Sequence, residues 1–135
     1  MISDNLLENV KYSEGFSETP YEDDKGILTI GYGTNISVIS KKEAELLLSN
    51  RINNAVKDVD KLLGYDVIID LSDKQKDSLY ELMYWIGLPR FSKFVKMIKA
   101  LRSHNWNKAS EEMMDSQLGV NYKTRANRLS NALKG

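Results

Sequence analysis

The sequence predicts a mainly α fold of the α+β class, in which a helical lobe and a small β-hairpin lobe flank a cleft. Two observations carry this prediction. Apolar residues recur at helical spacing along most of the chain, whereas residues 19–34 combine turn residues with a short β-branched run. The 135 residues fit one domain, 1–135, with the β-lobe at about residues 16–39 inserted after the first helix.

The first expected element is a helix that ends at Gly15. Ser3 is a suitable N-cap, and Leu6, Leu7 and Val10 form an apolar stripe. Glycine at the end of a helix provides the backbone conformation that stops it. The chain therefore leaves its first helix directly before the β-region.

The β-region is marked by turn residues on both sides of a short apolar run. Residues 23–26 have the composition of a turn, and residues 27–30 have that of a strand. Pro20, Gly31 and Gly33 interrupt the neighbouring segments. We expect a hairpin here, with its turn at residues 23–26.

Helices are expected from residue 40 to the C-terminus. Ser40–Glu43 and Ser72–Gln75 are capping boxes that each open a helix. Gly64 ends the first helix, and Gly87 with Pro89 breaks the second. The apolar residues expected on the inner faces of these and later helices are Ala44, Leu48, Ile52, Ala55, Val59, Leu62, Leu79, Leu82, Met83, Ile86, Phe94, Val95, Ile98, Leu101, Trp106, Ala109, Met113, Ala126, Leu129 and Leu133.

The overall composition is that of an ordinary globular protein and excludes several classes. Hydrophobic residues make up 41% and charged residues 28%, and the formal net charge of zero argues against a general nucleic-acid binder. The absence of cysteine excludes disulfides and thiolate metal sites. Residues 1–12 do not have the pattern of a signal peptide, and no apolar run is long enough to span a membrane. We expect a monomer without stable membrane insertion.

The charges are unevenly distributed along the chain. Residues 1–87 contain nine Lys/Arg and sixteen Asp/Glu, a net charge of −7, and residues 88–135 contain ten and three, a net charge of +7. Two interpretations stay open: each half has an ordinary solvated surface, or the basic C-terminal region attracts a polyanion such as a bacterial wall.

Carboxylates are the strongest candidates for chemistry. His104 is the only histidine and is expected at the surface, and no metal-ligand motif or phosphate-binding loop is present. Glu14 follows Leu7 by seven residues, so it should project along the same helix stripe. Loss of solvation and the negative end of the helix dipole would both favour a protonated acid, as a glycosidase requires. A structural acid paired with an arginine explains the position equally well.

A second carboxylate lies in the predicted turn, at Asp23 or Asp24. A wet turn keeps a carboxylate ionised, and two acids in contrasting environments are the arrangement for glycoside hydrolysis. An Asp pair in a turn also has a purely structural explanation. Thr29, on the following strand, is a residue that could hold a water molecule. Spacing alone does not choose between the two aspartates.

At these residues the sequence resembles the phage-type lysozymes, glycoside hydrolase family 24. In that family a Glu is followed by an Asp after eight intervening residues and by a Thr after five more. Glu14, Asp23 and Thr29 have this spacing here. The segment from Gly26 to Gly33 also matches, as do segments around Lys42, Trp106 and Arg125, so the resemblance covers nearly the whole chain. It implies a lysozyme-like fold and an endolysin that needs no cofactor and no metal.

The resemblance also implies a role for each residue. Glu14 would be the general acid, Asp23 the base or anionic stabiliser, and Thr29 the group that orients the attacking water. The substrate would be the β-1,4 bond between N-acetylmuramic acid and N-acetylglucosamine in peptidoglycan, cleaved with inversion. Inversion implies carboxyls roughly 6.5–9.5 Å apart. Arg125 matches a family arginine that reaches towards the catalytic Glu.

Tyr32, Trp85 and Phe94 are the expected substrate-binding residues. Trp85 stands where the family usually has an amide, so an aromatic ring would stack on a sugar in place of one hydrogen bond. Thr34 replaces a structural histidine found in some members. Residues 35–39 form a short connection where larger members carry extra structure, which implies a small β-lobe with few sugar subsites.

Three functional hypotheses follow from the sequence. The first is a muramidase for host lysis that stays in the host cytoplasm until it is released, or its variant, a virion-borne enzyme. The second is a non-catalytic wall-binding module, and the third is a lytic transglycosylase, which uses one Glu and needs neither Asp23 nor Thr29. Product analysis separates the three.

Overall fold

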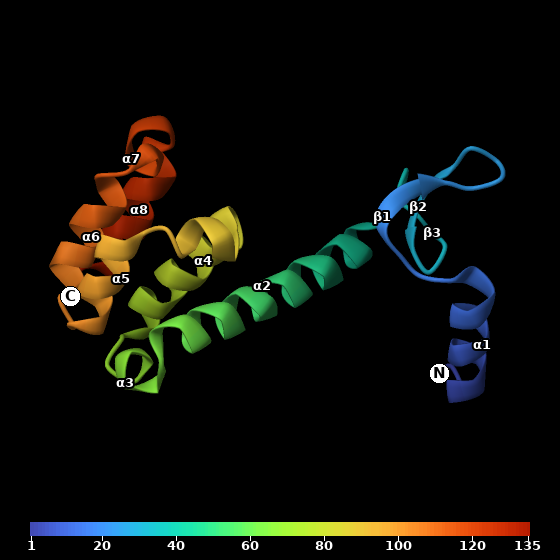
Figure 1. Ribbon diagram of the computed structural model, residues 1–135, viewed down its shortest axis with the longest axis horizontal. Coiled ribbons are helices and arrows are strands. Elements are labelled where there is room, and N and C mark those ends of the chain that lie inside the picture. Colours follow the sequence, from blue (N-terminus) through green and yellow to red (C-terminus); the bar gives the residue numbers. More distant parts are fainter. The chain divides into compact units, whose positions relative to one another are not determined.

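The computed structural model describes residues 1–135 and divides into two compact units, residues 1–46 and residues 47–135. Figure 1 labels their elements along the chain. Unit 1 holds the first helix and the sheet, and unit 2 holds the remaining helices, while helix α2 begins in unit 1 and continues in unit 2. The mainly α composition with one small sheet confirms the predicted fold class. The units are described separately.

Unit 1 begins with helix α1, Asp4–Glu14, and the two predicted caps lie at its ends. The Ser3 side chain accepts a hydrogen bond from the Leu6 amide at 3.1 Å. Gly15 takes a positive φ of 69°, and its N–H donates to the Lys11 carbonyl at 2.9 Å. These bonds satisfy backbone groups that the helix itself leaves unpaired at its ends.

A three-stranded antiparallel sheet follows α1, in the order β1 (Ser17–Glu22), β2 (Leu28–Gly31) and β3 (Thr34–Asn35). Tyr21 pairs with Thr29 between β1 and β2, and Ile30 pairs with Thr34 between β2 and β3. The predicted turn lies between β1 and β2, where the Gly26 amide donates to the Asp23 carbonyl at 2.9 Å. Strand β3 was not expected from the sequence.

Helix α2, Lys41–Leu63, opens with the predicted capping box. The Glu43 amide donates to Ser40 Oγ at 3.1 Å, and the Ser40 amide donates to Glu43 Oε1 at 3.2 Å. These hydrogen bonds lower the pKa of Glu43. The predicted apolar stripe is buried only in its second half, at Ala55 and Val59, with Leu63 buried in addition.

The first half of that stripe lies outside the core cluster of unit 2. Ala44, Leu48 and Ile52 are all exposed, with exposed fractions of 42% for Leu48 and 39% for Ile52. The core cluster of unit 2 begins at Ala55, so it does not include the earlier turns of α2.

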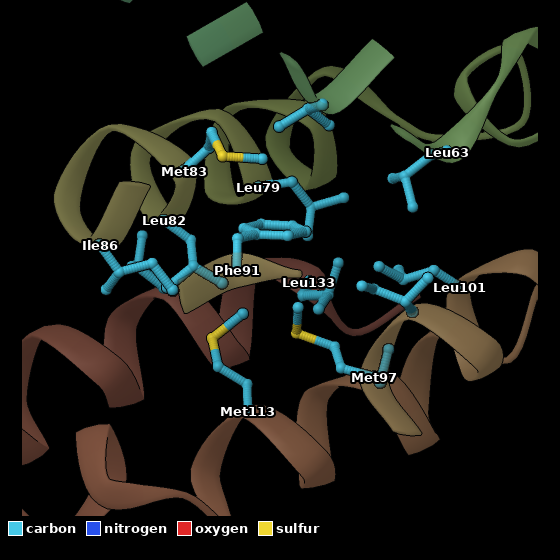
Figure 2. Packing of buried hydrophobic residues seen from close by; sticks show 14 of the residues in the cluster. Leu63, Leu79, Leu82, Met83, Ile86, Phe91, Met97, Leu101, Met113 and Leu133 are labelled. Carbon is cyan, nitrogen blue, oxygen red and sulfur yellow. The ribbon is translucent and has the colours of Figure 1, made fainter. Parts of the chain in front are cut away.

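Unit 2 packs its helices around one hydrophobic core. The helices are α3 (Tyr65–Ile68), α4 (Asp73–Phe91), α5 (Val95–Arg102), α6 (Trp106–Met114), α7 (Gln117–Asn121) and α8 (Lys123–Leu133). Figure 2 shows labelled side chains of this core converging on Phe91, which is fully buried. The short helices α3 and α7 were not expected. The predicted inner-face residues of α4 (Leu79, Leu82, Met83 and Ile86) are all buried.

Buried hydroxyl and amide groups join α4 and α6 to α8. Gln75 Nε2 donates to the Leu133 carbonyl at 3.0 Å, and Ser78 Oγ donates to the Leu129 carbonyl at 2.6 Å. Ser110 Oγ donates to the Ser130 carbonyl at 2.9 Å. Because a buried polar group without a partner is costly, these bonds favour one packing of the helices.

A break in α4 turns the chain towards α5. Gly87 has φ 81° and ψ 163°, which is not helical, and Pro89 follows two residues later. The predicted break at Gly87 and Pro89 is therefore confirmed. Figure 1 places α4 and α5 in the same group of helices.

Candidate active site

Glu14 is the last residue of α1, directly before the glycine that ends the helix. The side chain is exposed, and no residue of α1 is buried. Unit 1 by itself therefore does not bury this carboxyl, and the expected inward orientation stays a prediction. Unit 1 has 46 residues and a single buried side chain, so it is too small to enclose a face of α1.

The Glu14 side chain instead lies against the turn between β2 and β3. A Cβ atom built on Gly33 would stand 2.8 Å from Cδ and 3.2 Å from Cγ of Glu14. Gly33 also has a positive φ of 72°, which side-chain-bearing residues rarely adopt. Position 33 therefore needs glycine for two separate reasons, and the backbone of the turn holds one side of the acid.

Asp23 lies in the turn before β2, with one carboxylate oxygen held by backbone amides. Its Oδ1 accepts hydrogen bonds from the amides of Lys25 and Ile27, each at 2.8 Å. These bonds orient the carboxylate through Oδ1, and neither of them uses Oδ2. The neighbouring Asp24 is exposed. The turn-forming role suggested by the sequence is thus present, and it orients the carboxyl that the family spacing selects.

Thr29 is in the middle of the hairpin and is the buried residue of unit 1, with 4% of its surface exposed. Its Oγ1 donates to the Ile27 carbonyl at 2.8 Å. Because a hydroxyl has a single proton, this bond leaves Oγ1 free only to accept. A water at Thr29 would therefore donate to it and keep its own lone pairs available.

Strand β2 separates the two acids. Asp23 lies in the turn before β2, Thr29 is inside it, and the glycine that touches Glu14 lies in the turn after it. Asp23 therefore precedes β2, and Glu14, from the end of α1, contacts the turn that follows β2, with Thr29 inside the strand.

Tyr32 lies in the same turn as Gly33 and forms an aromatic pair with Phe16. Their ring centroids are 5.2 Å apart, and both rings are largely exposed, 44% for Tyr32 and 61% for Phe16. Lys11 Nζ lies 5.8 Å from the centroid of the Tyr32 ring. Two exposed rings beside Glu14 and Gly33 provide an apolar surface of the kind that stacks on sugars.

In unit 2, Arg125 forms a cluster with Trp85 and Glu81. The Arg125 guanidinium carbon lies 4.5 Å from the Trp85 ring centroid, and Nε donates to Glu81 Oε2 at 3.0 Å. Arg128 donates to the same Glu81 oxygen, and Tyr122 contacts Trp85 edge-on at 5.4 Å between centroids. Arg125 therefore has a carboxylate partner within unit 2, and its reach towards Glu14 stays a prediction.

The hydrogen bond from Arg128 lowers the pKa of Glu81, and the bond from Arg125 acts in the same direction, while partial desolvation opposes both. Glu81 is therefore ionised at neutral pH and holds the two guanidinium groups. This holds the Arg125 guanidinium group over the Trp85 ring.

The other expected residues lie elsewhere in unit 2. Phe94 is half-buried and packs against the hydrophobic core. His104 is exposed, as expected, and its Nδ1 lies 3.1 Å from Asp70 Oδ2. No group of three or more His, Asp or Glu side chains comes together in a way that would hold a metal ion. No helix is long and apolar enough to cross a membrane.

Comparison with known proteins matches this arrangement to one family. The phage lysozyme family model covers residues 11–128, a range that includes Glu14, Asp23 and Thr29. The chain belongs to the phage lysozyme family. A lysozyme-type glycosidase role with peptidoglycan as substrate follows from that membership, and the resemblance seen in the sequence is confirmed.

Two curated relatives show how far this similarity extends. A probable T4-type lysozyme 2 from Dictyostelium discoideum is 26% identical over 158 residues, covering 96% of this chain and 92% of the relative. An endolysin from Bacillus phage B103 is 31% identical over 121 residues, covering 84% of this chain and 44% of that protein. The chain thus spans less than half the length of the phage endolysin.

Three residues received no functional role from the sequence: Gly33 and Phe16 in unit 1 and Glu81 in unit 2. The Gly31-Tyr32-Gly33 segment was identified as an interruption after the strand and as part of the family match, but two glycines around one residue also signal a tight turn. Phe16 directly follows Glu14-Gly15, which places an aromatic ring next to the acid. Glu81 had no local signal, because its partners are 44 and 47 residues away.

Replacing Gly33 with alanine should displace the Glu14 carboxyl. We expect Gly33→Ala to lower lysozyme turnover by about a hundredfold, since small misplacements of a catalytic group have effects of that size. Gly31→Ala is the matched control, because Gly31 also has a positive φ, 65°, but no atom within 4 Å of its added Cβ. Equal loss in both variants, measured at equal folded fraction, would contradict the contact.

The Glu81 cluster predicts a pH-dependent contribution to stability. Because the pKa of Glu81 is lowered in the folded state, its stabilisation is present above the unfolded value, about 4.3, and is lost as pH falls through the folded value. Glu81→Gln should lower the free energy of unfolding at pH 7 by less than about 1 kcal/mol and leave it unchanged near pH 2. Urea unfolding at both pH values tests this, and an equal difference at both would refute it.

Proposed function

We propose that this lysozyme hydrolyses the β-1,4 bond between N-acetylmuramic acid and N-acetylglucosamine of peptidoglycan with inversion. The observation that carries the proposal is the order of groups along one hairpin. Asp23 is held at the start of β2, Thr29 lies within the strand, and Glu14 contacts the turn at its end. Two separated carboxyls with a water-binding group between them are the requirements of inverting hydrolysis.

Glu14 acts as the general acid. Its proton passes to the glycosidic oxygen as the bond from that oxygen to C1 of the muramic acid breaks. The contact with Gly33 supports this role, since the rigid turn limits where the carboxyl can lie. A fixed acid reacts faster than a mobile one because less orientation is needed in the transition state.

Asp23 and Thr29 act on the water. The water donates one hydrogen to Thr29 Oγ1, whose own proton is occupied by the Ile27 carbonyl. Its other hydrogen points to Asp23, and its oxygen attacks C1 on the face opposite the leaving group. The proton released by the water passes to Asp23, so the two carboxyls exchange protonation states over one turnover.

Aromatic side chains bind the sugars in this proposal. Tyr32 and Phe16 present an exposed pair of rings beside Glu14. In unit 2, Trp85 occupies the position of a family amide, and Arg125 covers one face of its ring. We assign a sugar-contacting role to Tyr32 and Trp85. Phe94 is assigned a role in shaping the site from the core, in line with its packing.

In the cell, the enzyme would serve host lysis as a monomeric endolysin. The similarity to the Bacillus phage endolysin supports this role. The protein would remain in the host cytoplasm until a membrane lesion releases it to the wall. A virion-borne enzyme with the same chemistry is the second location that we consider.

Substitution of the two acids tests the mechanism. Glu14→Gln should lower the release of reducing ends from purified peptidoglycan by about a hundredfold or more, which is the usual contribution of a general acid. Asp23→Asn should have a comparable effect. Asp24→Asn is the matched control in the same turn and should retain activity within about twofold, because surface changes away from the reacting groups have small effects.

The products separate the competing functions in the same assay. Reducing muramic acid ends indicate hydrolysis, an anhydro sugar indicates a transglycosylase, and binding without products indicates a wall-binding module. Near wild-type rates for Glu14→Gln, or a larger loss for Asp24→Asn than for Asp23→Asn, would overturn the proposed roles.

The role of Thr29 is tested by two variants of different chemistry. Thr29→Val keeps the shape but removes the hydroxyl, and we expect it to lower kcat more than tenfold by misplacing the water. Thr29→Ser keeps the hydroxyl and should retain most activity. Both variants are compared at equal folded fraction by circular dichroism. Equal kcat values for Val and Ser would show that the hydroxyl is not used.

A further inference from the structure

A row of cations follows helix α5 on the surface of unit 2. Lys93, Lys96, Lys99 and Arg102 occur at every third position, and all four side chains are exposed. Residues three apart on a helix are neighbours, about 4.5 Å apart along its axis. Unit 2 as a whole contains fifteen Lys/Arg and ten Asp/Glu, which gives it a net charge of +5.

Three adjoining hollows lie along this cationic row. The first, of about 270 Å³, is lined by Lys93 and Lys96, and the second, of about 410 Å³, by Lys96 and Lys99. The third, of about 350 Å³, is lined by Lys99 and Arg102. The first and second hollows share Lys96, and the second and third share Lys99, so cations of the row line all three.

The cations of the row are not neutralised by the protein. None of the four takes part in an ion pair, and Arg102 donates to a backbone carbonyl, that of Leu62, at 2.9 Å. Glu112 lines two of the hollows, but Lys108 already holds it at 3.2 Å. Asp115 lines only the first hollow. The row therefore presents unmatched positive charge.

The position of the lysines is not explained by helix stability. Cations are favourable near the C-terminus of a helix, which accounts for Lys99 and Arg102. Lys93 and Lys96 lie at the N-terminal end of α5, where the helix dipole disfavours positive charge. These two cations repel each other and lie where the helix dipole disfavours them. Their positions therefore suggest that an external anion is their partner.

We propose that the cationic row of α5 binds the phosphodiester chain of wall polymers of the teichoic acid type, which are attached to the peptidoglycan substrate. The inference rests on the proposed action at the bacterial wall. A linear polymer with one negative charge per repeat suits a row of single positive charges. Single-stranded nucleic acids are also phosphodiester chains, but proteins bind them in part by stacking bases on aromatic rings. The only ring along the row is Phe94, which is half-buried against the core.

The test measures binding separately from catalysis. Variants are made in the Glu14→Gln background, and binding to immobilised poly(glycerol phosphate) teichoic acid is measured at increasing salt. Lys96→Gln/Lys99→Gln should weaken binding by about tenfold at low salt and give a shallower salt dependence, because two phosphate contacts are lost. Lys96→Arg/Lys99→Arg should bind like the parent.

Lys57→Gln/Lys74→Gln is the matched control, since it removes the same charge from two exposed lysines of unit 2 outside the row. It should bind within about twofold of the parent, because only long-range, screened attraction is lost. Equal weakening in the control and the row variant would overturn the proposal. Preferential competition by single-stranded DNA at equal phosphate concentration would also overturn it and assign the row to nucleic acid.

Activity of the row variant with Glu14 intact distinguishes this inference from the proposed function. On walls stripped of teichoic acid, Lys96→Gln/Lys99→Gln should release reducing ends at the parent rate, and only intact walls should show a loss. A loss of the same size on stripped walls would refute a polymer-binding role. If the parent releases no reducing ends, the hydrolase proposal fails while the binding result still stands on its own.

Discussion

The contact between the Glu14 side chain and Gly33 is the constraint on which the site depends. It joins the end of helix α1 to the turn that connects β2 and β3, where Lys11 of α1 also approaches the Tyr32 ring. The contact is possible because position 33 has no Cβ atom and can take a positive φ. Within unit 1, this contact sets the direction of the acid through the backbone of the hairpin.

This constraint explains how a unit of 46 residues can position two acids. Asp23 is oriented by amide groups of its own turn, and Thr29 is the side chain that the sheet buries. Each group is therefore fixed by local backbone geometry, with strand β2 as the spacer. A small sheet achieves this with hydrogen bonds, which act at short range and do not require a large buried area.

Unit 2 is stabilised differently and carries other chemistry. Its core is built from α4, α5, α6 and α8 around Phe91, and buried serines lock the helix contacts. Because the core stabilises unit 2, charged side chains can occupy its surface. Glu81 holds two arginines beside Trp85, while the lysines of α5 remain unpaired. Paired cations thus mark the aromatic cluster, and unpaired cations mark the proposed polymer path.

Local signals in the sequence were sufficient for much of the fold. The caps at Ser3, Ser40 and Ser72 and the break at Gly87 were predicted because each depends on residues within a few positions. Burial was harder to predict, since periodicity marks an apolar face but not its partner, as Ile52 and the α1 stripe show. The Glu81 cluster was missed because it joins distant segments. The spacing of Glu14, Asp23 and Thr29 was informative only through family resemblance.

The central claim is that Glu14 and Asp23, separated by β2, hydrolyse the substrate through a water attacking from the opposite face. Proton NMR of the first products from a muropeptide oligosaccharide, recorded before mutarotation, tests it most directly. Inversion predicts that the new reducing end of muramic acid appears first as the α-anomer. A β-anomer would show a retaining enzyme, and an anhydro sugar would show a transglycosylase; either result would contradict the account.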